Sequence, residues 1–91
     1  MEFEGDPIKA TANLEKHGVS FQDAATVFKD PLSVTFPDPD HSVGENRYII
    51  IGQSTVGLLL IVAHTERDQK LRIISTRKAT RKERTFYEEG F

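Results

Sequence analysis

The cationic residues of this chain are concentrated in one short segment. Eight of the twelve Lys and Arg residues lie between positions 67 and 84, against two carboxylates, so the segment carries a local charge of +6 in a chain of net charge −2. Such a concentrated field draws a polyanion to one surface while the rest of the molecule stays acidic. The eight cations are Arg67, Lys70, Arg72, Arg77, Lys78, Arg81, Lys82 and Arg84.

Groups that can transfer protons are interleaved with these cations. An imidazole such as His64 exchanges a proton near neutral pH, Glu66 can do so if it is desolvated, and Tyr87 can transfer a proton or stack on a base. Cleavage of RNA needs a base for the ribose 2′-OH, an acid for the leaving 5′-oxygen and cations against the pentavalent phosphorane. The combination indicates RNA as the ligand and RNA cleavage as the reaction.

The residues of this segment fall into two predicted groups. Arg suits the stabilisation of phosphorane because its planar fork binds phosphate in a bidentate manner and keeps its charge. The predicted catalytic residues are His64, Glu66, Arg72, Arg77, Arg81 and Tyr87. The predicted RNA-binding residues are Arg67, Lys70, Lys78, Lys82 and Arg84. A second interpretation stays open, because a Lys/Arg run near a C-terminus is often only the solvated face of a helix.

No metal or other cofactor is expected. Asp38, Asp40 and His41 could ligate a metal, but an acidic loop rich in proline is usually only a turn. The chain has no cysteine for a thiolate site, and it contains no P-loop, dinucleotide fingerprint, HExxH or serine-elbow motif. His17, at the end of a predicted helix, is interpreted as a residue that favours the helix dipole rather than as a base. Asn13, Lys16 and His17 lie within one turn of each other, so a polar functional cluster there stays open as an alternative.

Local signals predict the elements that position these residues. Asp6 followed by Pro7 begins a helix that ends at Gly18. A second helix, over 21–30, carries one apolar stripe and ends at Pro31. Alternation with a period of two then predicts strands over 32–36, 47–53, 58–66 and 70–77, and a capping box over 80–83 begins a helix that runs to residue 89.

The predicted fold class is α+β, with two N-terminal helices packed on a four-stranded antiparallel sheet and a C-terminal helix. Consecutive strands pair most simply as a meander, and helices on one face leave the other face or its rim free for a ligand. Pairing Arg67 with Lys70 across the last turn gives a register in which His64, Glu66 and Arg77 share one face.

Composition limits the class of protein. Ninety-one residues supply one core, so residues 1–91 are interpreted as a single domain, and 37% hydrophobic with 29% charged residues fits a soluble globular protein. The longest strongly apolar run, 58–63, is too short to span a bilayer, and the acidic N-terminus lacks a signal core. A cytoplasmic protein without a membrane partner is therefore expected, and its net acidity disfavours direct binding of DNA.

Three segments resemble one known family. FEGDPIKATANLEKHGVSFQDAATVFKDP at the start, DPDHSVGENRYIIIGQST in the middle and HTERDQKLRIISTRKATRKERTFYEEG at the end resemble the BrnT family of type II toxins. KHGVSFxxAxxVFxDP and RIISxRKATxxER are the specific motifs, and the resemblance covers nearly the whole chain. Family members usually carry Trp in an FEWD opening where this chain has Gly5, so the packing near the first helix is expected to differ.

The resemblance implies a RelE-like ribonuclease toxin that arrests translation and that a BrnA-like antitoxin with a DNA-binding domain neutralises. The complex would repress its own operon, so DNA would be bound only through the antitoxin. We therefore expect a metal-independent endoribonuclease that cleaves mRNA, free or on the ribosome, and leaves a 2′,3′-cyclic phosphate and a 5′-hydroxyl. The alternative is a module that binds RNA or an acidic antitoxin without chemistry.

Overall fold

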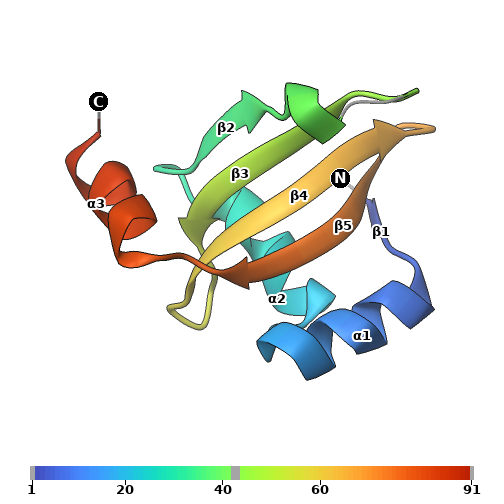
Figure 1. Cartoon of the computed structure of the whole chain (residues 1–91), viewed down its shortest axis with the longest axis horizontal. Coiled ribbons are helices and arrows are strands. Elements are labelled where there is room, and N and C mark those ends of the chain that lie inside the picture. Colours follow the sequence, from blue (N-terminus) through green and yellow to red (C-terminus); the bar gives the residue numbers. More distant parts are fainter. Residues whose placement is uncertain (1, 42–43, 91) are drawn as a thin grey trace.

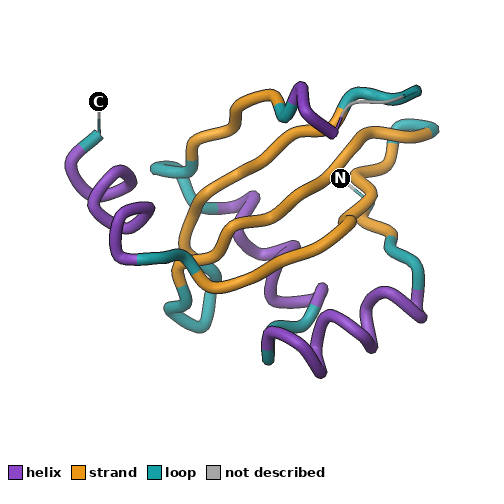
Figure 2. Tube along the Cα trace, viewed as in Figure 1, coloured by secondary structure: helices purple, strands orange, loops and turns teal. Residues whose placement is uncertain are grey.

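The structure, a computed structural model, describes residues 2–41 and 44–90. Helices α1 and α2 lie together on one side of a curved sheet, whereas α3 stands apart from them where β5 leads out of the sheet (Figures 1 and 2). The elements are β1 (Phe3–Glu4), α1 (Pro7–His17), α2 (Phe21–Thr26), the 3₁₀ turn η1 (Val27–Lys29), β2 (Val34–Pro37), the 3₁₀ turn η2 (Pro39–His41), β3 (Arg47–Gln53), β4 (Leu59–Arg67), β5 (Lys70–Lys78) and α3 (Arg81–Glu89).

The sheet differs from the predicted one, although the α+β class is confirmed. It has five strands in the order β1-β5-β4-β3-β2, and β1 pairs with β5 in parallel while the other neighbours are antiparallel. The prediction of four antiparallel strands was wrong because Phe3 and Glu4 add a fifth strand beside Leu71 and Arg72. Two residues are too few for alternation to indicate a strand.

A β-bulge in β5 changes the register partway along the last hairpin. The predicted pairing of Arg67 with Lys70 is confirmed, but farther from the turn Ala63 pairs with Ser75 rather than with residue 74. Ile74 is therefore the extra residue in β5. Because neighbouring residues of a strand point to opposite faces, one extra residue exchanges the two faces of the strand beyond it.

The bulge places Arg77 on the face that α1 and α2 leave uncovered. Arg77 pairs with Ile61, whereas His64 and Glu66 pair with the core residues Ile73 and Leu71 on the side of the helices. The predicted shared face of His64, Glu66 and Arg77 is therefore wrong, because the prediction assumed a regular strand. The arginine and the two proton-transfer candidates lie on opposite sides of the sheet.

Each face of the sheet carries its own apolar cluster. The larger cluster lies between the sheet and the N-terminal helices, and the smaller one lies beneath α3, where Tyr87 packs against it. The larger cluster consists of Val19, Phe21, Ala24, Val27, Ile50, Leu60, Val62 and Ile73. The smaller cluster consists of Ile51, Leu59 and Ile61. Among the described residues, no helix has both the length and the apolar character needed to cross a membrane.

A side chain, that of Asn13, satisfies some of the backbone hydrogen-bonding groups on the outer edge of β5. Beyond the short pairing with β1, Asn13 Nδ2 donates to the Thr76 carbonyl oxygen at 2.9 Å, and the Thr76 N–H donates to Asn13 Oδ1 at 3.0 Å. The same Nδ2 donates to the Val19 carbonyl oxygen at 3.0 Å. Asn13 is only 7% exposed, so these bonds fix the C-terminal half of α1 against β5.

Polar contacts attach α3 to the sheet. The predicted capping box is present: Thr80 Oγ1 accepts a bond from the Glu83 N–H, and Glu83 Oε1 accepts one from the Thr80 N–H. Glu83 also accepts two bonds from Arg77, from Nη1 at 2.7 Å and from Nη2 at 2.9 Å. Near the other end of α3, the Tyr87 hydroxyl donates to Asp30 Oδ2 at 2.5 Å. The helix is thus held at both ends.

Candidate functional site

The uncovered face of the sheet carries the arginines of β3, β4 and β5. Arg47 and Arg72 each pair with Thr65, one from either side, so the three residues share a face. Alternation along β4 adds Arg67 to this face, and the bulge adds Arg77. Three of the predicted site arginines therefore lie on one side of the sheet, with Arg47 as a fourth that was not predicted.

A cavity of about 380 Å³ lies on this face, and it is called here the sheet-face cavity. Apolar residues of β3 and β4 line it together with polar residues from α1, from β5 and from the segment after β2. The lining residues are His17, Asp38, Ile49, Ile61, Ala63, Ser75, Thr76 and Arg77. An apolar floor with cationic and polar groups at its rim suits a flexible single strand, whose bases stack while its phosphates contact cations.

Most of the predicted cations have carboxylate partners. Exposed pairs of this kind contribute little to stability, but each one lowers the local positive charge. The pairs are Arg67–Glu45 at 2.9 Å, Lys70–Glu2 at 3.6 Å, Arg72–Glu4 at 3.7 Å, Arg77–Glu83 at 2.7 Å and Arg84–Glu88 at 3.7 Å. Within residues 2–41 and 44–90, the remaining three cations, Lys78, Arg81 and Lys82, have no carboxylate partner. They follow one another across the junction of β5 and α3.

The pair of Arg77 and Glu83 fixes a guanidinium at the edge of the cavity. The hydrogen bonds from Arg77 lower the pKa of Glu83 to about 2, and the same carboxylate raises the pKa of Arg77. Both groups therefore stay charged at any physiological pH. The pair uses Nη1 and Nη2 of the guanidinium and leaves the Nε side of the fork for another acceptor.

His64 lies in the core rather than at the cavity. It is 4% exposed, its ring makes an edge contact with Phe28 at 4.8 Å between centroids, and it stacks on Tyr48 at 6.0 Å. Nδ1 lies 3.3 Å from the Val62 carbonyl oxygen. Burial lowers the pKa of His64 below its usual range, so the ring is neutral and packed on the helix side of the sheet.

Glu66 and Tyr87 are also absent from the lining of the sheet-face cavity. Glu66 borders a separate hollow on the helix side, which it shares with His64 and Tyr48. Burial, followed by the hydrogen bond to Asp30, raises the pKa of Tyr87 to about 12. A phenol with such a pKa keeps its proton at neutral pH, so the contact to Asp30 holds α3 in place.

Two titratable residues that line the cavity, His17 and Asp38, were not among the predicted catalytic or RNA-binding residues. His17 is half-buried at the end of α1, and Asp38 follows β2. The sequence had left a polar cluster of Asn13, Lys16 and His17 open, because residues three or four apart lie on the same side of a helix. What the sequence could not indicate is that Asn13 binds β5. The side chain of His41, one of the candidate metal ligands, lies outside the described part of the structure; the described residues contain no group of three His, Cys, Asp or Glu side chains placed to hold an ion.

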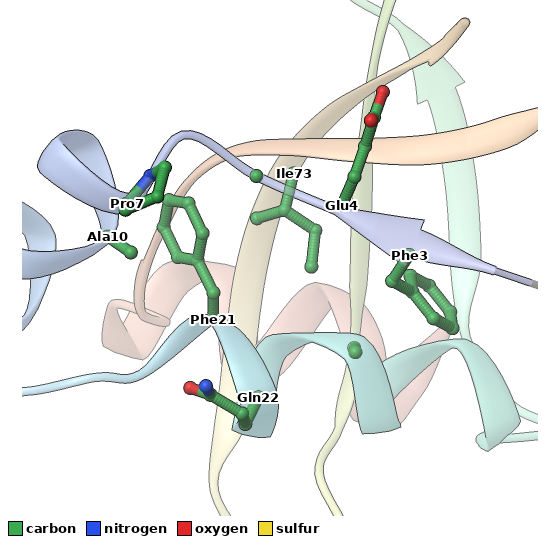
Figure 3. Close-up of a pocket in the computed structure, with 9 residues that line it drawn as sticks. Phe3, Glu4, Pro7, Ala10, Phe21, Gln22 and Ile73 are labelled. Atoms are coloured by element: carbon green, nitrogen blue, oxygen red, sulfur yellow. The ribbon is translucent and has the colours of Figure 1, made fainter. Parts of the chain in front are cut away.

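A larger cavity, of about 440 Å³, lies between β1, α1 and α2 (Figure 3). Its walls are mainly apolar, and Figure 3 shows Phe3, Phe21 and Ile73 around it. Gly5 borders this cavity, and a Cβ atom there would lie 2.7 Å from Cδ2 of Phe21. Any side chain at position 5 therefore requires the Phe21 ring to move. The expected local difference in packing lies here, on the opposite side of the sheet from the sheet-face cavity.

The fold and the site together define a small α+β protein with a cationic, partly hollow sheet face. The sequence model of one family, described as "Ribonuclease toxin, BrnT, of type II toxin-antitoxin system", matches residues 6–83. The chain therefore belongs to the BrnT family of ribonuclease toxins, which confirms the resemblance seen in the sequence. The crystal structure of the Brucella abortus ribonuclease toxin BrnT is similar, with a TM-score of 0.70 and 24% identity over 89% of this chain and 99% of that chain. No curated protein matches the chain.

Proposed function

We propose that this protein is a metal-independent endoribonuclease toxin that cleaves mRNA in the cytoplasm, arrests translation and is neutralised by a BrnA-like antitoxin. Membership of the ribonuclease toxin family supports the enzymatic part. The observation that carries the proposal is the sheet-face cavity, because the Arg77 guanidinium borders its apolar floor on the strand that leads into the three cations without carboxylate partners. A RelE-like mode of action remains part of the proposal.

The proposed reaction is attack of the ribose 2′-oxygen on the adjacent phosphorus, with loss of the 5′-oxygen. Arg77 contacts the non-bridging oxygens, where charge develops in the phosphorane. Arg81 and Lys82 hold the phosphates that flank the scissile bond, and Lys78, which points to the other face of β5, can reach only a more distant phosphate. The requirement for a 2′-hydroxyl selects RNA over DNA. His64 and Glu66 are not assigned as the base, because the sheet separates both residues from Arg77.

A second function, docking of an acidic antitoxin or of RNA without chemistry, is favoured by one specific observation. Five of the eight clustered cations are already paired with carboxylates within the described part of the chain, and such pairs weaken a phosphate site. The three unpaired cations would then form the contact with the partner. Both functions can use one surface, since an antitoxin that covers the sheet-face cavity would also block RNA.

The test is cleavage of a defined mRNA by the purified protein, with and without ribosomes and in the presence of a chelator, with both cut ends mapped. We expect 5′-hydroxyl and 2′,3′-cyclic phosphate ends at unchanged yield in chelator. The double variant Arg81→Ala/Lys82→Ala should cleave at least about tenfold more slowly, the loss expected from two phosphate contacts. Removing cations near the start of a helix should not destabilise α3.

A matched control separates this local effect from a change in total charge. The double variant Lys9→Ala/Lys29→Ala also removes two exposed cations, on the side of the N-terminal helices, and should cleave like the wild type. Folded wild-type protein that leaves RNA uncut under all conditions would remove the enzyme proposal. If that protein still binds its antitoxin, the docking function is supported instead.

A further inference from the structure

The end of α1 is fixed next to the sheet-face cavity. Asn13 binds both backbone polar groups of Thr76, at 2.9 and 3.0 Å, so this helix cannot slide along β5 without leaving buried groups unsatisfied. His17 follows Asn13 by four residues and therefore lies on the same side of α1, toward β5. Gly18 then turns the chain away, in the left-handed conformation.

His17 is the histidine, among the side chains that the structure describes, that lines the sheet-face cavity. Its imidazole shares this cavity with the Arg77 guanidinium and the exposed hydroxyl of Ser75. It is half-buried, so it is held by the protein and still reachable from solvent. His64 cannot take this position, because it lies in the core on the other side of the sheet.

We infer that His17 is the catalytic base of the RNA cleavage; this inference rests on the proposed function. The imidazole takes the proton of the 2′-hydroxyl as the 2′-oxygen forms a bond to phosphorus. The bond from phosphorus to the 5′-oxygen breaks, its electron pair stays on that oxygen, and solvent water supplies the proton that makes the 5′-hydroxyl. The imidazolium then returns its proton to solvent, so the 2′,3′-cyclic phosphate forms without consuming water.

The charged neighbours of His17 come from three elements. Arg77 of β5, bonded to Glu83 of α3, and Asp38 after β2 border the same cavity, and Lys16 lies in the same turn of α1. Arg77 is the neighbour suited to phosphate, since a guanidinium binds it in a bidentate manner. This arrangement places the proton acceptor and the phosphate-binding group on one cavity but on different elements.

The experiment measures single-turnover cleavage of a defined RNA by the wild type and by His17→Gln from about pH 5 to 8, the range in which an imidazole titrates. We expect His17→Gln to cleave about 100- to 10,000-fold more slowly, the usual contribution of a general base, and to lose the pH dependence seen in the wild type. Lys16→Gln, in the same turn of the helix, is the matched control and should keep both the rate and the profile.

Binding and folding readouts make the outcome specific. An RNA with a 2′-deoxyribose at the cleavage site should bind equally well to the wild type and to His17→Gln, and both should unfold at similar temperatures. If the wild type cleaves RNA and His17→Gln cleaves it at the same rate and with the same pH profile, the inference is overturned and the proposed function still stands. Wild type that never cleaves RNA overturns the proposed function itself. If His17→Gln does not fold, a wild-type rate that is constant over this pH range overturns the inference.

Discussion

Arg77, the arginine proposed to contact phosphate, already has a carboxylate partner. Its two bonds to Glu83 fix the plane of the guanidinium, and this fixed geometry reduces the entropy lost when a phosphate arrives. Glu83 also belongs to the capping box of α3. The orientation of this arginine therefore depends on the start of the C-terminal helix.

The first prediction at this scale concerns acid. The pKa of Glu83 is lowered from 4.5 to about 2, chiefly by its hydrogen bonds from Arg77, so its ionised form stabilises the folded state above pH 4.5. That contribution should disappear as the pH falls from about 4.5 to about 2. In urea denaturation, the stability difference between the wild type and Glu83→Gln should shrink over this range. Glu89→Gln, an exposed change on the same helix, should show no such trend.

The second prediction concerns the clamp on β5. Asn13→Ala removes a buried side chain that satisfies the Thr76 N–H, the Thr76 carbonyl and the Val19 carbonyl. Leaving such groups unpaired should destabilise the protein by about 3 kcal/mol, measured by urea denaturation. Asn46→Ala, an exposed change of the same kind, should cost less than about 0.5 kcal/mol. A cost below about 1 kcal/mol for Asn13→Ala would contradict this account.

The sequence indicated which residue types make up the candidate site, but it did not indicate which residues they contact in the fold. The cationic segment and its arginines could be read directly from the chain. That His64 lies in the core and His17 at the cavity depends on contacts between distant segments, such as the bond between Asn13 and Thr76, 63 positions apart. No local pattern contains that information.

At the scale of elements, α3 is held on the sheet by a small number of side-chain contacts. None of its residues is fully buried, and its contacts include the Arg77–Glu83 pair at one end, the Tyr87–Asp30 bond near the other, and apolar contacts of Tyr87 with the smaller cluster and of Phe86 with Phe36. Asp30 also accepts bonds from the backbone N–H groups of Leu32 and Gln53, so it connects α3 to the turn before β2 and to β3. The helix bears two of the three unpaired cations, and its position therefore determines where they would contact RNA under the proposed function.

The third prediction tests this attachment. Tyr87→Phe keeps the ring against the smaller apolar cluster and removes only the hydroxyl that donates to Asp30. The loss of one hydrogen bond to a charged group should cost about 1.5 kcal/mol and speed hydrogen exchange over residues 81–89. Tyr48→Phe, in β3, should leave exchange in α3 unchanged. Equal exchange in Tyr87→Phe and the wild type would show that other contacts hold the helix.

Local signals predicted the helices well and the sheet less well. Capping residues, the left-handed glycine and the capping box act within a few residues, so they indicated where α1 and α3 begin or end. The strand β1 has two residues and is a strand only because its backbone pairs with the edge of β5. The bulge at Ile74 likewise depends on how β5 meets β4. Both features arise from tertiary packing and leave no periodic pattern.

At the scale of the whole molecule, acidic residues predominate in the first half of the chain and basic residues in the second half. The fold brings some of them together as ion pairs. Residues 1–45 carry −6 and residues 46–91 carry +4. The N-terminal carboxylates Glu2, Glu4 and Glu45 come back to pair with Lys70, Arg72 and Arg67. The positive field that remains is centred on the junction of β5 and α3, and the molecule should bind RNA in one orientation rather than coat it.

The fourth prediction follows from this small remaining field. Three unpaired cations should give a slope of about −2 for the logarithm of RNA affinity against the logarithm of salt concentration, at about −0.7 for each phosphate contact of a single strand. Arg81→Ala/Lys82→Ala should reduce the slope to about −0.7. Filter binding over a salt series measures both. A much steeper wild-type slope would show that the paired arginines release their carboxylates to bind phosphate.

The extra residue at Ile74 also limits how β5 of this protein can change in length. A deletion of one residue between the bulge and α3 would move Arg77 to the side of the N-terminal helices and turn a core position toward water. An insertion or deletion of two residues leaves each remaining side chain on its original face of the sheet and changes only the length of the strand. Among viable descendants of this sequence, insertions and deletions in this strand should therefore come in even numbers.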